Sequence, residues 1–163
     1  MTDNQAISVT QQLDAGIRFL QGQVSLLWSI LYGILNLIKY FLQTHNNVFG
    51  TLSMCHTSCW LNDAGSLESY LSTIKSWLDA NPSQVITLLL TNGDGVGISS
   101  FGDAFSSSGL SNYAYSPGST LNMDQWPTIQ QLIDSGNRLV VFLGIICLSL
   151  YKPFTNPVDR FWR

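Results

Sequence analysis

Charged residues are scarce in this sequence, at 10% of its 163 residues, whereas an average globular domain has roughly 25%. The formal net charge is −3 and there is no run of lysines and arginines. A nucleic-acid-binding protein would carry clustered basic residues, so the sequence predicts no nucleic-acid partner. The shortage of charge has two explanations: a surface that faces a membrane, or segments that are not ordinary folded sequence.

Several common catalytic motifs are also missing. The GxSxG motif of α/β hydrolases and the HExxH motif of zinc proteases do not occur. The NGDGVG stretch at 92–97 lacks both the Walker lysine and the Rossmann spacing. Met1–Gln5 is polar and no basic segment leads into an apolar run, so the sequence as written predicts no N-terminal export signal. The missing motifs exclude an α/β hydrolase with a GxSxG serine, an HExxH zinc protease, and a Walker or Rossmann nucleotide site at 92–97.

Cysteine is rare, with Cys55, Cys59 and Cys147. The first two form either a local disulfide in an oxidising compartment or a pair of reduced, buried thiols. A zinc site built from them and His56 is not favoured, because structural zinc needs four ligands and no second pair follows at a suitable spacing. We therefore predict no metal site.

What the sequence does contain is an alternation of apolar runs and amphipathic segments. Such alternation indicates α/β layering with right-handed crossovers between parallel strands. The chain is shorter than the roughly 250 residues of a complete (β/α)₈ barrel. Strands are predicted at 17–20, 52–55, 85–90 and 138–143, and helices at 6–16, 66–79, 101–105 and 127–135. We expect the strands to be parallel and adjacent in the order in which they occur, with the helices at 66–79 and 127–135 packed on one outer face.

Residues 24–42 depart from this alternation. The segment VSLLWSILYGILNLIKYFL is apolar over about the length of a membrane-spanning helix, and Lys39 near one end can reach the interface. It is apolar on all sides, so we expect one helix with few contacts to the strands. A genuine span would place the protein at a membrane through 24–42.

Candidate site residues are those that end or follow a predicted strand, because catalytic groups of parallel α/β proteins gather at the carboxyl ends of strands. His56 has the chemistry of a general acid or base near neutral pH, although a hydrogen-bonded structural histidine is the alternative. His45 suits a solvated loop, and Asp94 suits turn chemistry. The remaining candidates are Arg18, Gln21, Gln23 and Asn92.

Three stretches of sequence carry a family resemblance: NQAISVTQQLDAGIRFLQGQ, GTLSMCHTSCWLNDAGSLESYLSTIKSWLDANPSQVITLLLTNGDG and WPTIQQLIDSGNRLVVFL. They resemble fungal secreted PLC-like phosphodiesterases of the phosphatidylinositol-specific phospholipase C X-domain superfamily, over residues 4–23 and 44–143. The resemblance implies a partial TIM-type barrel of parallel strands with outer helices, joined here to the apolar helix at 24–42. It also implies a phospholipid or other phosphodiester substrate and an extracellular location.

The resemblance assigns roles to individual residues. His56 matches the histidine that acts as general acid on the leaving oxygen. Gln21 and Gln23 stand where bacterial relatives carry Asp and Arg and where eukaryotic relatives bind calcium through carboxylates. Neutral amides can hydrogen-bond a phosphate, but they supply neither the charge that stabilises the transition state nor the hard oxygens that calcium prefers. We therefore expect no cofactor and impaired activity.

Two segments, 24–43 and 144–163, do not match the pattern. The first is compatible with an unspliced intron, since a valine codon begins with GT and Gln43 can be encoded by CAG; the second is compatible with read-through after Gly144. The leading hypothesis is a single truncated phosphodiesterase-like hydrolase domain over 1–163. The alternatives are a membrane-anchored module without activity and a catalytically silent relative, secreted or not, that binds a lipid or sugar phosphate.

Overall fold

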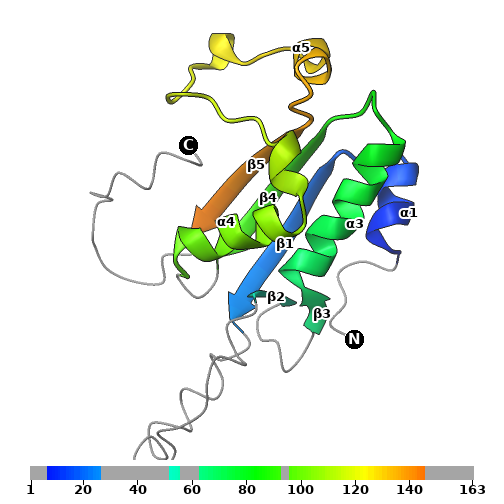
Figure 1. Cartoon of the computed structure of the whole chain (residues 1–163), viewed down its shortest axis with the longest axis vertical. Helices are drawn as coiled ribbons and strands as arrows, with labels where there is room; N and C mark the ends of the chain where they lie inside the picture. The colour runs from blue at the N-terminus through cyan, green and yellow to red at the C-terminus, as the bar shows by residue number, and fades with distance from the viewer. Residues whose placement is uncertain (1–6, 27–51, 56–62, 93–95, 146–163) are drawn as a thin grey trace, which may run out of the picture.

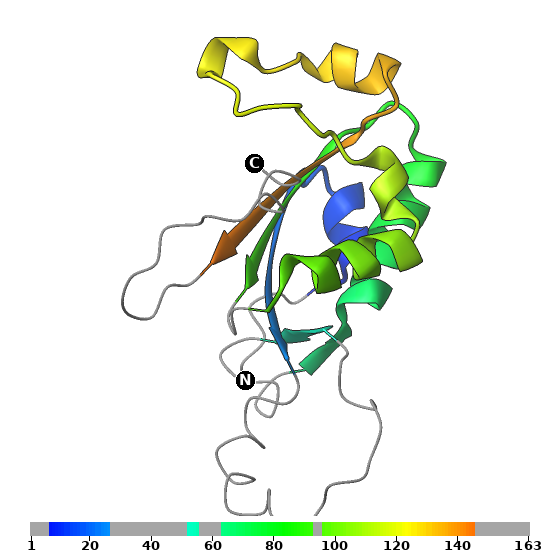
Figure 2. The same cartoon turned by 60° about the vertical axis from the view of Figure 1, so that its left-hand side comes forward.

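The structure is a computed structural model that describes residues 7–26, 52–55, 63–92 and 96–145. These residues form a five-stranded sheet with helices packed against one face (Figures 1 and 2). The elements in chain order are α1 (Val9–Asp14), β1 (Phe19–Leu26), β2 (Leu52–Cys55), β3 (Asp63–Ser66), α3 (Leu67–Ala80), β4 (Ile86–Asn92), α4 (Ile98–Ser107), η1 (Leu110–Tyr113), η2 (Met123–Gln125), α5 (Ile129–Asp134) and β5 (Leu139–Ile145).

The sheet is mixed, with the strand order β3-β2-β1-β4-β5. β4 lies between β1 and β5 and is parallel to both. β2 is antiparallel to β1, and β3 is antiparallel to β2. The predicted parallel pairing of β4 with β5 is confirmed.

The predicted partial TIM-type barrel is wrong: the described strands form an open, mixed sheet. β2 was expected to lie in parallel between β1 and β4, but β1 pairs directly with β4 over Phe19–Val24 and Thr87–Asn92. The reason lies in strand length. β1 and β5 are long enough to pair with the apolar β4 along most of its length. The four-residue β2 in the place of β1 would leave more backbone groups of β4 without a hydrogen-bond partner.

The predicted apolar helix at 24–42 is wrong where the structure describes it, because residues 24–26 belong to β1. Val24 is fully buried and is paired with Asn92 of β4 and with Met54 of β2. Valine is β-branched and favours a strand, and here it has a paired strand on each side, so β1 continues through the position where the helix was predicted to begin. Residues 27–42 lie outside the described part of the chain. Within the described part, no helix is both long and apolar enough to cross a membrane.

Local sequence signals explain where the helices begin. Ser8 and Gln11 form the expected capping box at the start of α1, and Thr128 and Gln131 form another at α5. The Ser66 hydroxyl accepts a hydrogen bond from the Ser69 amide and begins α3. The buried side of α3 has the predicted 3-and-4 spacing, with Leu67, Leu71, Ile74, Trp77 and Leu78.

The main core lies between the sheet and the helices α1, α3 and α4, as Figure 2 shows with these helices on one side of the strands. At Gly22 a Cβ would meet the terminal methyl group of Met54, so a larger residue there would require the end of that flexible side chain to move. α5 was expected beside α3, but its Leu132 packs on Val85 and Val140 in a second, smaller cluster.

Burial of Tyr70 on α3 leads to a prediction about alkaline stability. Burial raises the pKa of its hydroxyl from 10.0 to about 12. Because the folded-state pKa is raised, the protonated Tyr70 hydroxyl contributes to the free energy of unfolding. That contribution is fully present below pH 10 and is lost as the pH rises through 12. Two pH units correspond to about 2–3 kcal/mol. Urea unfolding between pH 8 and pH 12 should show this decline in the parent and a shallower one in Tyr70→Phe; equal declines would exclude Tyr70 as the cause.

Candidate functional site

One face of the sheet is not covered by α1, α3 or α4, and we call it the open face. α5 reaches this face at one end, where Leu132 packs on Val140. Side chains alternate between the two faces along each strand, and parallel neighbours in register share a face. Phe19 at 56% exposure and Phe142 at 41% show that this face is accessible. By register, the open face carries Phe19, Gln21 and Gln23 of β1, Thr87, Leu89 and Thr91 of β4, and Val140, Phe142 and Gly144 of β5.

Gln21 and Gln23 lie together on the open face, as the third and fifth residues of the eight-residue β1. In the sheet register Gln21 is the neighbour of Leu89, and Gln23 is the neighbour of Thr91. Gln21 is exposed and Gln23 is half-buried. Neither amide group has a hydrogen-bond partner among the described residues. Two amides and one hydroxyl are therefore available to a ligand at this edge.

Asn92 ends β4 but faces the other way. Its register partner is the buried Val24, so both side chains lie on the helix-covered face. The Asn92 amide donates to the carbonyl oxygen of Val96 at 2.8 Å, and its oxygen accepts from the Val96 amide at 2.9 Å. These two bonds fasten the chain after β4, and the structure does not bring Asn92 together with Gln21 and Gln23.

Arg18 lies at the amino end of β1, away from the edge formed by Gln23 and Thr91. Its guanidinium donates to Gln84 Oε1 at 2.8 Å and to the carbonyl oxygens of Leu13 and Ile17 at 2.6 and 2.8 Å. It also stacks over the Trp77 ring at 4.6 Å. All of these contacts hold the turn after α1 against β4 and α3. The sequence does not predict the contacts with Gln84 and Trp77, because both residues are far from Arg18 in the chain.

His56 lies outside the described residues, as do Cys59, His45 and Asp94. The structure does place the backbone immediately before His56. Cys55 ends β2, and its neighbour Met54 pairs with Val24. The end of β2 therefore lies beside the same part of β1 that carries Gln23. The Cys55–Cys59 disulfide and the role of His56 stay predictions.

The chemistry available at this edge is limited to neutral hydrogen bonding in the part of the site that is described. The open-face residues carry the amides of Gln21 and Gln23, the hydroxyls of Thr87 and Thr91 and apolar groups, and none of these side chains is ionisable. Calcium requires several hard oxygen ligands, preferably carboxylates. The described chain contains no cluster of three or more His, Cys, Asp or Glu side chains. The donor set on the open face therefore does not fit calcium.

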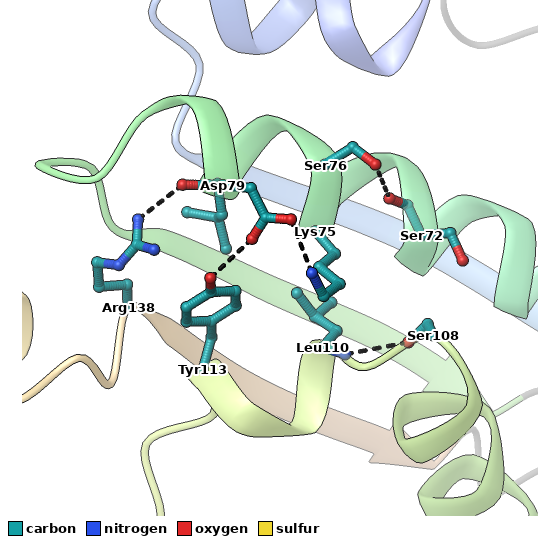
Figure 3. A network of polar contacts seen from close by, with 9 residues as sticks. Ser72, Lys75, Ser76, Asp79, Ser108, Leu110, Tyr113 and Arg138 are labelled. Atoms are coloured by element: carbon teal, nitrogen blue, oxygen red, sulfur yellow. Dashed lines mark hydrogen bonds and ion pairs between the residues drawn. The ribbon is translucent and has the colours of Figure 1, made fainter.

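A polar network on the helix-covered side fastens α3, η1 and β5 together (Figure 3). The Tyr113 hydroxyl donates to Asp79 at 2.7 Å, and Lys75 forms an ion pair with the same carboxylate at 2.7 Å. Arg138 stacks over the Tyr113 ring at 4.5 Å and donates to the carbonyl oxygen of Leu78 at 2.9 Å. The network uses its polar atoms internally, so its role is structural.

The ion pair in this network shifts the pKa of both partners. The hydrogen bond from Lys75, and after it the one from Tyr113, lowers the pKa of the Asp79 carboxyl. The hydrogen bond to Asp79 raises the pKa of the Lys75 amine. The Asp79 contribution is present above the carboxyl's unfolded-state pKa and is lost as the pH falls through the folded-state pKa. Because both groups are at the surface, the pair adds little stability.

A hollow of about 570 Å³ lies near the start of β5, between the segment 115–127 and α5. Its lining includes Tyr115, Asp124 and Trp126. Tyr115 donates its backbone amide to the carbonyl oxygen of Leu139, the first residue of β5, which fixes the hollow at the amino end of that strand. The sequence predicts a loop here, but no motif in it indicates a pocket.

Comparison with known proteins gives consistent matches. The family model PI-PLC X 1 matches residues 1–31 and 34–149. A protein of Arthroderma benhamiae described as "PI-PLC X domain-containing protein 1" is 50% identical over 141 residues, which are 86% of this chain and 40% of that protein. An "Uncharacterized secreted protein" of the same fungus is 39% identical over 144 residues, covering 88% of this chain and 28% of that protein. No solved structure matches.

Proposed function

Because the chain belongs to the PI-PLC X domain family, we propose that it is a phospholipase-C-like phosphoric diester hydrolase. The proposed substrate is an inositol phospholipid or a related phosphodiester. The chain spans 40% and 28% of the lengths of the two curated relatives described above. An extracellular location is part of the proposal, and the relative described as a secreted protein supports it.

The observation that carries this proposal is the position of Gln21, Gln23 and Thr91 on the open face, beside the end of β2. Their amide and hydroxyl groups have no hydrogen-bond partner within the described part of the chain, and they suit the non-bridging oxygens of a phosphate and the hydroxyls of a ring polyol. His56 follows Cys55, the last residue of β2. In the proposed reaction a hydroxyl of the inositol ring or a water molecule attacks the phosphorus and loses its proton to solvent. The bond from phosphorus to the diacylglycerol oxygen breaks, and His56 donates a proton to that oxygen while the two amides hold the phosphate.

We expect this site to cleave a phosphodiester slowly. The residues described at this edge offer neutral donors, and a neutral donor stabilises the developing charge of a phosphoryl-transfer transition state less than a cation does. The guanidinium of Arg18 is held at the far end of β1 by its own contacts. We therefore expect weak cleavage whose rate depends strongly on His56.

A second candidate function is binding without catalysis. It is favoured by the same observation, because the described part of the open face provides hydrogen-bond donors and acceptors but no titratable group. In that case the domain would retain an inositol phosphate or a lipid headgroup without cleaving it. The two candidates differ only in whether diacylglycerol is released.

One experiment distinguishes the candidates and tests the role of the glutamines. Vesicles of phosphatidylinositol and phosphatidylcholine are incubated with the parent chain and with a Gln21→Ala, Gln23→Ala double variant, and both sedimented protein and released diacylglycerol are measured. We expect the double variant to bind the phosphatidylinositol vesicles about tenfold more weakly than the parent, since two hydrogen bonds of about 1 kcal/mol each are lost in part.

The matched control for the glutamine variant is Thr87→Ala, which removes a polar group from the same face near the other end of β4. This variant should bind like the parent. Diacylglycerol release favours the hydrolase and binding alone favours the second candidate. Equal binding by the parent and the double variant would remove Gln21 and Gln23 from the site.

A further inference from the structure

The hollow at the amino end of β5 combines an aromatic surface with fixed polar groups. Trp126 is 39% exposed and lies against Tyr115, with ring centroids 6.3 Å apart and an angle of 49° between the rings. It also lies against Phe142, at 6.0 Å and 44°. The two neighbouring rings contact Trp126 directly and hold it in place. A ligand therefore cannot lie between them and would stack on the exposed surface of Trp126.

Two amide donors in the hollow are held in place by local structure. The side-chain oxygen of Gln125 accepts from the Asn122 amide at 2.8 Å, and that of Gln131 accepts from the Thr128 amide at 2.8 Å. Each bond orients the amide and leaves its Nε2 without a partner among the described residues. Donors that are fixed in advance lose little entropy when a ligand binds.

The acceptor in the hollow is Asp124, which has neither an ion pair nor a hydrogen bond within the described chain. The lining contains no Lys, Arg or His. A carboxylate without a neighbouring cation repels phosphate, so an anionic ligand is disfavoured. A quaternary ammonium would suit the ring and the carboxylate, but it could not use the two amide donors. The lining suits a neutral ligand with several hydroxyl groups.

We propose that this hollow is a saccharide-binding site in which a neutral hexopyranose ring stacks on Trp126. The C–H groups of a pyranose face would pack on the exposed indole ring, which buries apolar area on both partners. Gln125 and Gln131 would donate to ring hydroxyls, and Asp124 would accept from one. The volume of about 570 Å³ lies within the range of small-molecule pockets.

This site is separate from the one proposed for the phosphodiester. Gln21 and Gln23 lie in the middle of β1, and β4 separates that strand from β5. Tyr115 bonds to the first residue of β5, and Trp126 contacts Phe142, which is level with Gln21 on the far side of β4. The two sites therefore share the open face but have no residue in common. Saccharide binding should therefore be unaffected by His56→Ala. It goes beyond the proposed hydrolase activity and does not depend on it.

Isothermal titration calorimetry tests the proposal with linear hexaoses of glucose and of mannose as probes. We expect at least one hexaose to bind the parent. Trp126→Ala should weaken that binding about tenfold or more, because the stacking surface is lost. Asp124→Asn should weaken it a few-fold, because a charged acceptor becomes a neutral one. Trp126→Phe, which keeps a ring against Tyr115, should retain most of the affinity and shows that the fold is intact.

The control variant is Met123→Ala, which changes a side chain that is 95% exposed, next to Asp124 and outside the lining. It should bind the hexaose like the parent. Additional titrations use choline chloride, myo-inositol and D-myo-inositol 1-phosphate. The proposal is overturned if no hexaose binds, if hexaose binding survives Trp126→Ala, or if one of these three ligands binds in a Trp126-dependent manner in place of the hexaoses.

Discussion

Replacing His56 with alanine is expected to reduce phosphatidylinositol cleavage by about 10²–10⁴-fold, the usual contribution of a general acid. Without the imidazole, the leaving alkoxide must take its proton from water. The other groups assigned to this edge are the amides of Gln21 and Gln23 and the hydroxyl of Thr91, and none of them gives up a proton at neutral pH. The measurement is the initial rate of diacylglycerol release from vesicles.

Affinity should change far less than rate in this variant, because the phosphate contacts are assigned to the amides and not to His56. Binding of D-myo-inositol 1-phosphate to His56→Ala should stay within a few-fold of the parent. His45→Ala is the matched control, since His45 lies in the THNN segment, for which we predict a solvated loop. If His45→Ala abolishes cleavage and His56→Ala does not, the assignment of the general acid is wrong.

Replacing Arg138 with methionine is expected to lower the free energy of unfolding by about 2–4 kcal/mol. Arg138 is 7% exposed, and its guanidinium donates to the carbonyl oxygens of Leu78 at 2.9 Å and Asn81 at 3.0 Å. Methionine retains most of the volume but donates no hydrogen bond, so two carbonyls near the end of α3 lose a charged donor. Losses of this kind cost about 1–3 kcal/mol for each group.

Thermal and urea unfolding measure the effect of Arg138→Met, with Lys75→Met as the matched control. Lys75 belongs to the same network (Figure 3), but its ion pair with Asp79 is at the surface. Its removal should change the melting temperature far less than the Arg138 variant does. Equal shifts for the two variants would contradict the structural role given to the buried guanidinium.

The sequence predicts most of the described elements, because their signals are local. β2 has the predicted bounds, and α3 follows its apolar 3-and-4 spacing from Ser66 onward. β3 was not predicted, since its residues DAGS have low strand propensity and Gly65 adopts a φ of 94°. Its pairing depends on β2 and is therefore a tertiary effect.

The strand order could not be obtained from local patterns. Both the parallel and the antiparallel placement of LSMC are compatible with its composition, and the choice depends on which ladders satisfy the most backbone groups. The same limit applies to the candidate site. The sequence predicts Gln21, Gln23 and Asn92 as site residues because each ends or follows a predicted strand. Only the register between β1 and β4 shows that Asn92 lies on the opposite face of the sheet from the two glutamines.

The phosphate site on the open face is tested most directly by nuclear magnetic resonance of the ¹⁵N-labelled chain during titration with D-myo-inositol 1-phosphate. This measurement locates the ligand whether or not the chain cleaves a lipid. We expect the largest amide and side-chain shifts at Gln21, Gln23 and Thr91, and little change at Tyr115 and Trp126. Shifts centred on Trp126, or no saturable shift at the two glutamines, would contradict the placement of the phosphodiester on the open face of the sheet.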